Sequence, residues 1–188
     1  MPPTGRPLRA DARRNRGLLL AAAKELFAER GADAPLDDVA RRAGVCNATM
    51  YRHFPTRQEL IVAVYSDEVT ALCDQGAALL AEAAPGEALF GWLDAFIAHV
   101  ATKRELALAL ADDRAGHRSA LFDRWHDAMR STASALLVRA QRAGAVRAEL
   151  DVADLLALAG GIALSGADDE QIRRLVRLIM SGVDTTTI

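Results

Sequence analysis

Cysteines, aromatic residues and long apolar runs are all scarce in this chain of 188 residues. The only two cysteines, Cys46 and Cys73, form no CxxC pair, which argues against a zinc-finger framework and favours free thiols over a disulfide. No apolar run reaches the roughly 20 residues that span a bilayer, and no signal-peptide core follows the basic N-terminus. These absences lead us to expect a cytoplasmic protein with no membrane partner.

Catalytic and metal-binding signatures are missing as well. The sequence has no glycine-rich phosphate loop, no HExxH motif and no plausible Ser–His–Asp spacing. His99, His117 and His126 could be combined with nearby aspartates as metal ligands, but no pair has the tight helical spacing of a zinc motif. We therefore expect neither an enzyme nor a metal or cofactor site.

Charge is distributed unevenly, although the net charge is only −2. Residues 1–60 carry 11 Lys and Arg against 7 Asp and Glu, a net of +4, and residues 61–188 carry the other 12 against 18, a net of −6. Such asymmetry suggests that the N-terminal part meets a polyanion. Met1–Asp11 is rich in proline and should be disordered. With Arg13, Arg14 and Arg16 it forms a basic arm that could follow phosphates, enter a minor groove or remain a solvated tail.

Apolar residues recur with helical spacing along the chain, without strand-like alternation, so we expect an all-α fold of about nine helices. Residues 1–60 should form a three-helix helix-turn-helix domain with the basic arm. Residues 61–188 should form a larger helical domain for ligand binding and dimerisation. The expected helices are Asp11–Arg30, one after Pro35, Asn47–Phe54, Thr56–Ala83, Gly86–Ala101, Lys103–Ala111, Ser119–Ala143, Asp151–Ser165 and Asp168–Val183.

Two short helices joined at Gly44 are indicated between Leu36 and Arg57. At about 100° per residue, Met50 and Phe54 point inward from the second helix. Its opposite face carries Ala48, Thr49, Arg52 and His53, with Tyr51 on the flank. These side chains are suited to hydrogen bonds with phosphates and base edges, which indicates a DNA-reading face.

Residues 16–60 resemble the DNA-binding domain of TetR-family transcriptional regulators. The resemblance rests on Arg16, Leu19, Ala22, Ala23, Leu26, Phe27, Gly31, Val39, Ala40, Ala43, Gly44, Val45, Thr49, Tyr51, Phe54, Pro55, Glu59 and Leu60. It implies a homodimer whose third helices enter the major grooves of a palindromic double-stranded DNA operator. The DNA-binding residues would then be Arg16 of the arm, Thr49, Tyr51 and His53 on phosphates or bases, Arg57 clamping a phosphate, and Asn47, Ala48 and Arg52 setting specificity.

The chain departs from the family pattern at two helix starts. Cys46 stands where the family commonly has serine. Because cysteine is a poor cap, Asn47 could cap the helix instead and shift its start by one residue. Pro35 stands where threonine is frequent and could preorganise the first turn of its helix. An exposed, low-pKa Cys46 would be oxidation-sensitive, whereas a packing or capping role is the alternative.

Two sets of residues in the C-terminal part suggest a dimer interface and a ligand pocket. Apolar stripes on the last two helices could pair two subunits in a four-helix bundle, or could form the core of one chain. These residues include Leu155, Ala159, Ile162, Ile172, Leu175, Val176 and Ile179. Aromatic and polar side chains of the middle helices could line a small-molecule pocket, or could simply fill the core. They are Trp92, Phe96, His99, Phe122, Trp125, His126 and Met129.

The resulting hypothesis is a sequence-specific DNA-binding regulator, a repressor released from its operator by an unknown small-molecule effector. The alternative is a helical protein-interaction module, or a ligand-binding protein without specific DNA binding. The sequence names neither the effector nor the operator and its genes, and it does not distinguish a repressor from an activator.

Overall fold

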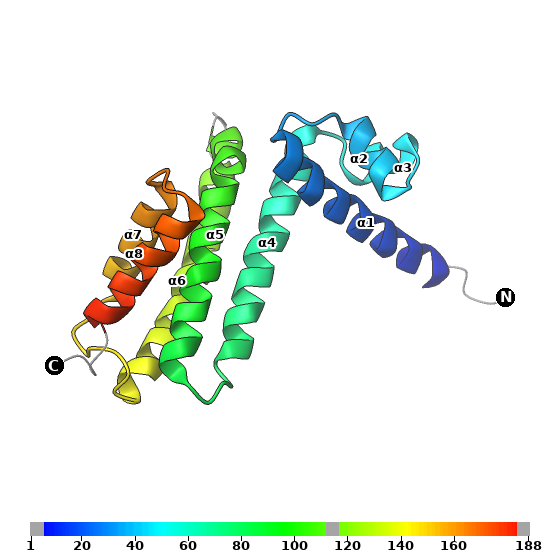
Figure 1. The fold of residues 1–188 in the computed structure, drawn as a ribbon. Coiled ribbons are helices and arrows are strands. Elements are labelled where there is room, and N and C mark those ends of the chain that lie inside the picture. Colours follow the sequence, from blue (N-terminus) through cyan, green and yellow to red (C-terminus); the bar gives the residue numbers. More distant parts are fainter. Residues whose placement is uncertain (1–5, 112–116, 184–188) are drawn as a thin grey trace. The chain divides into compact units, whose positions relative to one another are not determined.

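The computed structural model describes residues 6–111 and 117–183, which form eight α-helices and, within those ranges, no β-strand (Figure 1). The all-α fold expected from the sequence is therefore confirmed. The helices are α1 (Arg6–Arg30), α2 (Leu36–Ala43), α3 (Asn47–His53), α4 (Arg57–Leu79), α5 (Pro85–Ala111), α6 (His117–Arg142), α7 (Val152–Leu164) and α8 (Asp169–Val183).

The described ranges hold eight helices where about nine were expected, because the two helices expected over 86–101 and 103–111 are one continuous helix, α5. The expected break between them fell at Thr102. In the structure, the Thr102 hydroxyl donates a hydrogen bond to the Ala98 carbonyl oxygen, 2.8 Å away on the previous turn. With its hydroxyl satisfied inside the helix and no proline or glycine nearby, the chain has no local reason to leave the helical path.

The N-terminal arm also differs from expectation. Helix α1 begins at Arg6, so residues 6–11 are helical rather than disordered, and residues 1–5 of the expected arm lie outside the described residues. Pro7 falls in the first turn of the helix, where a missing N–H leaves no intrahelical hydrogen bond unmade. Leucine, arginine and alanine, which follow, are all good helix formers.

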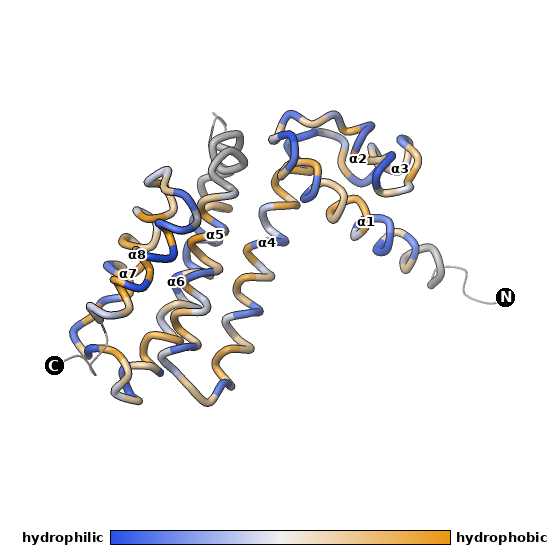
Figure 2. Tube along the Cα trace, viewed as in Figure 1, coloured by the Kyte–Doolittle hydropathy of each residue, from blue (hydrophilic) through white to orange (hydrophobic). Residues whose placement is uncertain are grey.

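The chain divides into two compact units. The first, called the head, comprises Met1–Asp67 and Glu105–Asp112, and the second, called the body, comprises Glu68–Arg104 and Asp113–Ile188. In the head, α1 packs against both α2 and α3. In the body, α6 packs on α7 and α7 on α8, and apolar positions recur along each of these helices (Figure 2).

Trp92 is at the centre of the body's core and is fully buried. Its indole Nε1–H donates a 3.0 Å hydrogen bond to the Leu72 carbonyl oxygen on α4. Glycine at position 76 permits close packing here, because a Cβ atom there would lie 2.2 Å from Thr132 Cγ2 and 2.9 Å from Trp92 Nε1. Helices α4, α5 and α6 thus meet around a residue with no side chain. No helix in the described ranges is both long and apolar enough to cross a membrane.

Candidate DNA interface

The turn between α2 and α3 has the geometry that the sequence predicted. Gly44 adopts φ +66°, a left-handed conformation that strains residues with a side chain. The backbone N–H groups of Gly44 and Val45 donate to the carbonyl oxygens of Arg41 and Ala40, at 3.2 and 3.0 Å. This pairing satisfies carbonyls at the end of α2 and turns the chain into α3.

Helix α1 supports this pair of helices with buried apolar residues and surface ion pairs. Leu19 and Ala23 of α1 are completely buried, as are Val39 of α2 and Met50 of α3. Toward the end of α1, Glu29 accepts two hydrogen bonds from the guanidinium of Arg42, at 2.7 and 2.9 Å. That pairing lowers the pKa of Glu29 and raises the pKa of Arg42. The head therefore presents α3 on a preformed frame.

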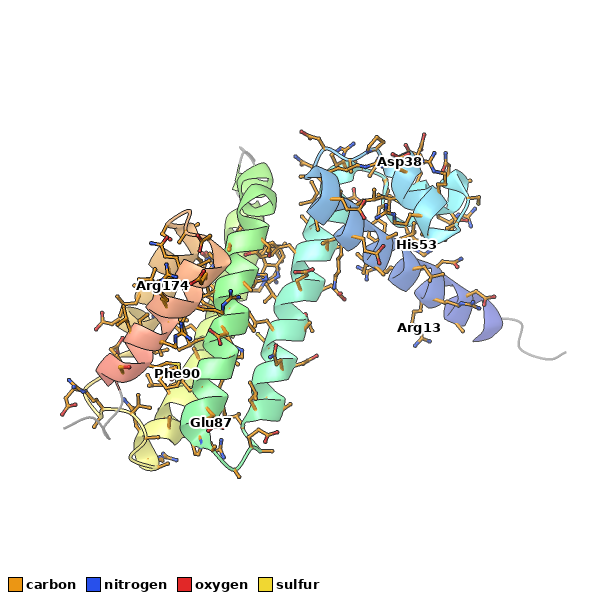
Figure 3. The ribbon with its side chains drawn as sticks, viewed as in Figure 1. Arg13, Asp38, His53, Glu87, Phe90 and Arg174 are labelled. Atoms are coloured by element: carbon orange, nitrogen blue, oxygen red, sulfur yellow. The ribbon has the colours of Figure 1, made fainter. Side chains whose placement is uncertain are left out.

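The outward side of α3 is accessible along its length. Asn47, Ala48 and Arg52 are exposed, Tyr51 is 45% exposed, and Thr49 is half-buried. His53, at the last turn of the helix, is also half-buried (Figure 3). The face expected to contact DNA is therefore accessible at the surface of the head.

Several arginines of the head lack a carboxylate partner in the described part of the chain. Among the described residues, Arg52 of α3 and Arg13 and Arg14 of α1 have no carboxylate partner (Figure 3 labels Arg13). The Arg16 guanidinium lies over the Phe54 ring, with Cζ 5.5 Å from the ring centroid. This contact brings a cation of α1 next to the end of α3, and phosphates attract such groups.

Tyr51 has a partner that the sequence did not suggest. Its hydroxyl donates a 3.3 Å hydrogen bond to Oδ1 of Asp37, in the first turn of α2. Asp37 lies in the first turn of α2, where the helix dipole also favours a negative charge. A separation of 14 residues gives no periodic signal that could have revealed the contact.

The start of α3 follows the family register. Cys46 is the N-cap residue and Asn47 is the first helical residue, so the possible one-residue shift does not occur. The Cys46 thiol caps no backbone N–H and instead lies 3.1 Å from Thr49 Oγ1. Hydrogen bonding from Thr49 lowers the pKa of Cys46, which is exposed. Asn47 therefore keeps its side chain available for the reading face.

The caps of α2 and α4 differ in kind. Thr56 caps α4 with its side chain, since its hydroxyl oxygen accepts a hydrogen bond from the Glu59 N–H at 3.2 Å. Pro35 was expected inside the first turn of α2 but occupies the N-cap position, with φ −60° and ψ 135°. Its carbonyl oxygen accepts from the N–H groups of Asp38 and Val39.

Arg57, expected to clamp a phosphate, contacts backbone carbonyls of its own chain. Its Nη1 donates hydrogen bonds to the carbonyl oxygens of Ala32 and Ala34, at 2.8 and 2.5 Å, and its side chain is half-buried. The guanidinium is thereby engaged with the segment between α1 and α2. Sequence reasoning missed this role because the acceptors are backbone atoms, which leave no trace in residue type.

The seven candidate pocket residues divide between interior and surface. Trp92, Phe96, His99, Trp125 and Met129 are buried in the body. The rings of Trp92 and Phe96 stack with centroids 5.5 Å apart, and Phe122 meets Trp125 edge-on at 5.4 Å. His99 Nδ1 lies 4.0 Å from Glu68 Oε2. His126, in contrast, is exposed, and its ring turns back on α6 with Nδ1 2.8 Å from the Phe122 carbonyl oxygen.

The candidate dimer residues likewise fall into two groups. Leu155, Ala159 and Val176 are buried within the chain, so they have almost no surface to offer a partner, and Ile162 is 9% exposed. Ile172, Leu175 and Ile179 remain half-buried. The same two helices expose Leu158, Leu164 and Leu178 by 52, 54 and 67%. An apolar groove beside them is lined in part by Leu158, Gly161, Ile162 and Leu175.

The described residues contain no group of three or more His, Cys, Asp or Glu side chains that could hold a metal ion. His117, one of the histidines considered from the sequence, has a side chain outside the described set. The site thus consists of α1, α2 and α3 with their cations and hydrogen-bonding groups.

Models of known protein families match residues in both the head and the body. The family model described as "Bacterial regulatory proteins, tetR family" matches residues 19–64. The model described as "Transcriptional regulator SbtR-like, C-terminal domain" matches residues 84–185. Together these two matches cover helices from both the head and the body.

Solved structures resemble nearly the whole chain. The TetR transcriptional regulator SCO0520 from Streptomyces coelicolor is 38% identical, with a TM-score of 0.79 over 91% of this chain and 99% of that one. A TetR transcription regulatory protein from Mycobacterium vanbaalenii is 40% identical, with a TM-score of 0.79 over 95% and 99%.

The similarity to a curated relative is more local. The HTH-type transcriptional activator FasR from Mycolicibacterium smegmatis is 45% identical over 58 residues, which cover 30% of this chain. The match spans only 26% of that relative's length.

Proposed function

Because this chain belongs to the TetR family of DNA-binding transcriptional regulators, we propose that it is a homodimeric, cytoplasmic repressor released from a palindromic operator by a small molecule. Members of this family regulate transcription and are not enzymes. The observation that carries the proposal is the exposed outer face of α3, which presents Arg52 without a carboxylate partner among the described residues and is supported by buried residues of α1.

The exposed residues of α3 would make different kinds of contact with DNA. Arg52 is exposed and has no carboxylate partner in the described chain, so it is available to bind guanine O6 and N7. Asn47, Ala48, Thr49 and His53 complete the base- and phosphate-contacting surface. Arg13, Arg14 and Arg16 on α1 contribute phosphate contacts from the adjoining helix. Two heads in a dimer would read half-sites about 34–36 Å apart.

The body supplies the proposed sensor. Its interior holds Trp92, Phe96, Trp125 and Met129, and His99 near the Glu68 carboxylate supplies a polar group. An effector entering this interior would be largely apolar with a polar end. It would have to displace packed side chains, and α4, which has residues in both units, would carry the change. Coupling of about 1–3 kcal/mol would change operator affinity about 5–150-fold.

Dimerisation would use the outer faces of α7 and α8. Leu158, Leu164 and Leu178 leave apolar side chains exposed on these two helices, and a partner subunit would cover part of them. Gly161 lines the adjoining groove, and a Cβ there would meet no described atom within 4 Å, which leaves room for a partner helix. The same surface on both subunits would give a closed twofold pair.

A test of DNA binding starts with the intergenic DNA beside the protein's own gene and with duplexes selected from random sequence. We expect a salt-sensitive, sequence-selective gel shift. Arg52→Ala should weaken it by about 1–3 kcal/mol and relax the preference at one base pair. Arg124→Ala, an exposed arginine of α6, is the matched control and should bind as the parent does.

Absence of any selective shift across such duplexes would refute operator binding. Transcription from the bound promoter then separates a repressor from an activator, since deletion of the gene should raise expression for a repressor. A screen of apolar small molecules for release of the bound duplex tests the effector. If no compound alters binding and no body variant changes expression, the sensing half of the proposal fails.

A further inference from the structure

Arg57, the first residue of α4, makes two hydrogen bonds to the segment that precedes α2. Its Nη1 is 2.8 Å from the Ala32 carbonyl oxygen and 2.5 Å from the Ala34 carbonyl oxygen, and its side chain is half-buried. Hydrogen bonds from a charged donor are stronger than neutral ones. Both acceptors lie in the short segment between α1 and α2, and Ala34 itself is 98% buried.

That segment determines where α2 begins. Four backbone hydrogen bonds are found at its described residues: the Gly31 N–H donates to the Phe27 oxygen, the Ala34 N–H to the Gly31 oxygen, and the N–H groups of Asp38 and Val39 to the Pro35 oxygen. The next residue, Pro35, is the N-cap of α2. Because α2 leads into α3 through a fixed turn, a shift at Ala34 would be passed to the reading face.

We infer that Arg57 is a positioning residue for DNA binding, which holds the α1–α2 segment so that α2 and α3 meet the duplex correctly, and that it does not neutralise a phosphate. A phosphate contact through Nη1 would require the loss of both carbonyl bonds, which would leave the oxygen of buried Ala34 without this donor. A contact through Nε or Nη2 would keep both bonds, and the salt dependence of binding tests for it. The inference rests on DNA binding by the family and is independent of the proposed effector.

The first experiment needs no DNA. Hydrogen exchange in the full-length protein is compared between the parent and Arg57→Met, which keeps an unbranched side chain but has no donor. The amides of Ala34, Asp38 and Val39, which are hydrogen-bonded around the segment, should exchange at least about tenfold faster in the variant.

Amides in the middle of α1 should keep their protection, because the variant loosens the segment without unfolding the head. Arg52→Met is the matched control, since Arg52 is exposed and unpaired among the described residues. Unchanged exchange at all three amides in Arg57→Met would overturn the inference. Equal acceleration throughout the head would overturn it too, because that result indicates general destabilisation.

The second experiment measures affinity for a selected duplex against salt concentration, at a temperature where circular dichroism shows each variant folded. A phosphate contact contributes about 0.9 to the slope of log affinity against log salt. We expect Arg57→Met to weaken binding about tenfold at every salt concentration with an unchanged slope, and Arg13→Ala to reduce the slope by about one. Arg57→Lys, which retains a charged donor, should recover part of the affinity.

A slope reduced by about one in Arg57→Met would identify a phosphate contact and overturn the inference. If the parent protein binds no duplex selectively, the proposed function fails, while the exchange experiment still decides whether Arg57 holds the segment.

Discussion

The Tyr51 hydroxyl donates a hydrogen bond to the Asp37 carboxylate across 3.3 Å, linking α3 to the first turn of α2. Both side chains are exposed at the edge of the reading face. The carboxylate can orient the tyrosine, and at a helix N-terminus its charge is locally favourable. The same charge repels DNA phosphates. The carboxylate of Asp37 therefore helps binding by orienting Tyr51 and hinders it by electrostatic repulsion.

Asp37→Asn should separate these two effects. An asparagine side chain keeps an oxygen that can accept from Tyr51 but removes the negative charge. We expect severalfold tighter DNA binding at low salt, with the gain shrinking as salt screens the charge. Fluorescence anisotropy at several salt concentrations measures this, with Asp37→Ala as the control that removes both. Weaker binding by Asp37→Asn at all salt concentrations would show that the charge itself is needed.

The thiol of Cys46 should react at lower pH than an ordinary cysteine. The hydrogen bond from Thr49 lowers the pKa of Cys46, so the thiolate forms earlier as pH rises. Alkylation rates against pH, followed by mass spectrometry in a Cys73→Ser background, give the midpoint. Thr49→Val should move it upward, and an unchanged midpoint would discount the hydrogen bond.

The lowered pKa of Cys46 also makes the stability of the head depend on pH. A thiol whose pKa is depressed in the folded state stabilises the head fully above the pKa of the unfolded chain. That contribution is lost as pH falls through the folded-state value. The parent should therefore gain stability relative to Cys46→Ala on going from neutral to alkaline pH, as thermal unfolding across that range would show.

Leu178 on α8 should decide the oligomeric state. It is 67% exposed, and a charge there would be buried against the partner in the proposed dimer. Leu178→Glu should shift the protein to monomers and weaken operator binding, as measured by size-exclusion chromatography with light scattering. Leu80→Glu, at another exposed leucine, is the control. A dimer that persists unchanged in Leu178→Glu would place the interface elsewhere.

Gly76 should tolerate no side chain. Gly76→Ala places Cβ against Thr132 Cγ2, a stiff branched side chain, and should destabilise the protein by about 1–3 kcal/mol. Gly91→Ala on α5 is the control, because a Cβ there meets no described atom within 4 Å and helix propensity should stabilise it by about 0.5–1 kcal/mol. Chemical denaturation measures both. Thr132→Ser should partly rescue Gly76→Ala, and full additivity of the two changes would contradict the clash.

The fold was predicted well wherever the helical spacing of apolar residues agrees with the residues that begin and end helices. Gly44 at its turn and Thr56 at its cap act through local backbone chemistry, which residue type reveals directly. The α5 break was predicted wrongly because a polar residue such as Thr102 can be satisfied inside a helix. The start of α1 was missed because a proline such as Pro7 is compatible both with a disordered tail and with the first turn of a helix.

Side-chain roles were harder to predict than elements. The inward stripe of α7 correctly marked Leu155 as apolar, but one sequence cannot say whether such a residue faces its own chain or another. Arg57 and Tyr51 were assigned to DNA, and their contacts with Ala34 and Asp37 arise from tertiary proximity that has no periodic signature.

Helix α4 runs unbroken from Arg57 to Leu79 through the boundary between the two units at Asp67 and Glu68. Each helical residue adds about 1.5 Å of rise and about 100° of rotation. Inserting a single residue in α4 would therefore rotate the part of the chain after the insertion by about 100° about the helix axis, relative to the part before it. We expect this helix to accept substitutions during evolution but almost no change of length, whereas the turn after Leu79 carries no such restriction.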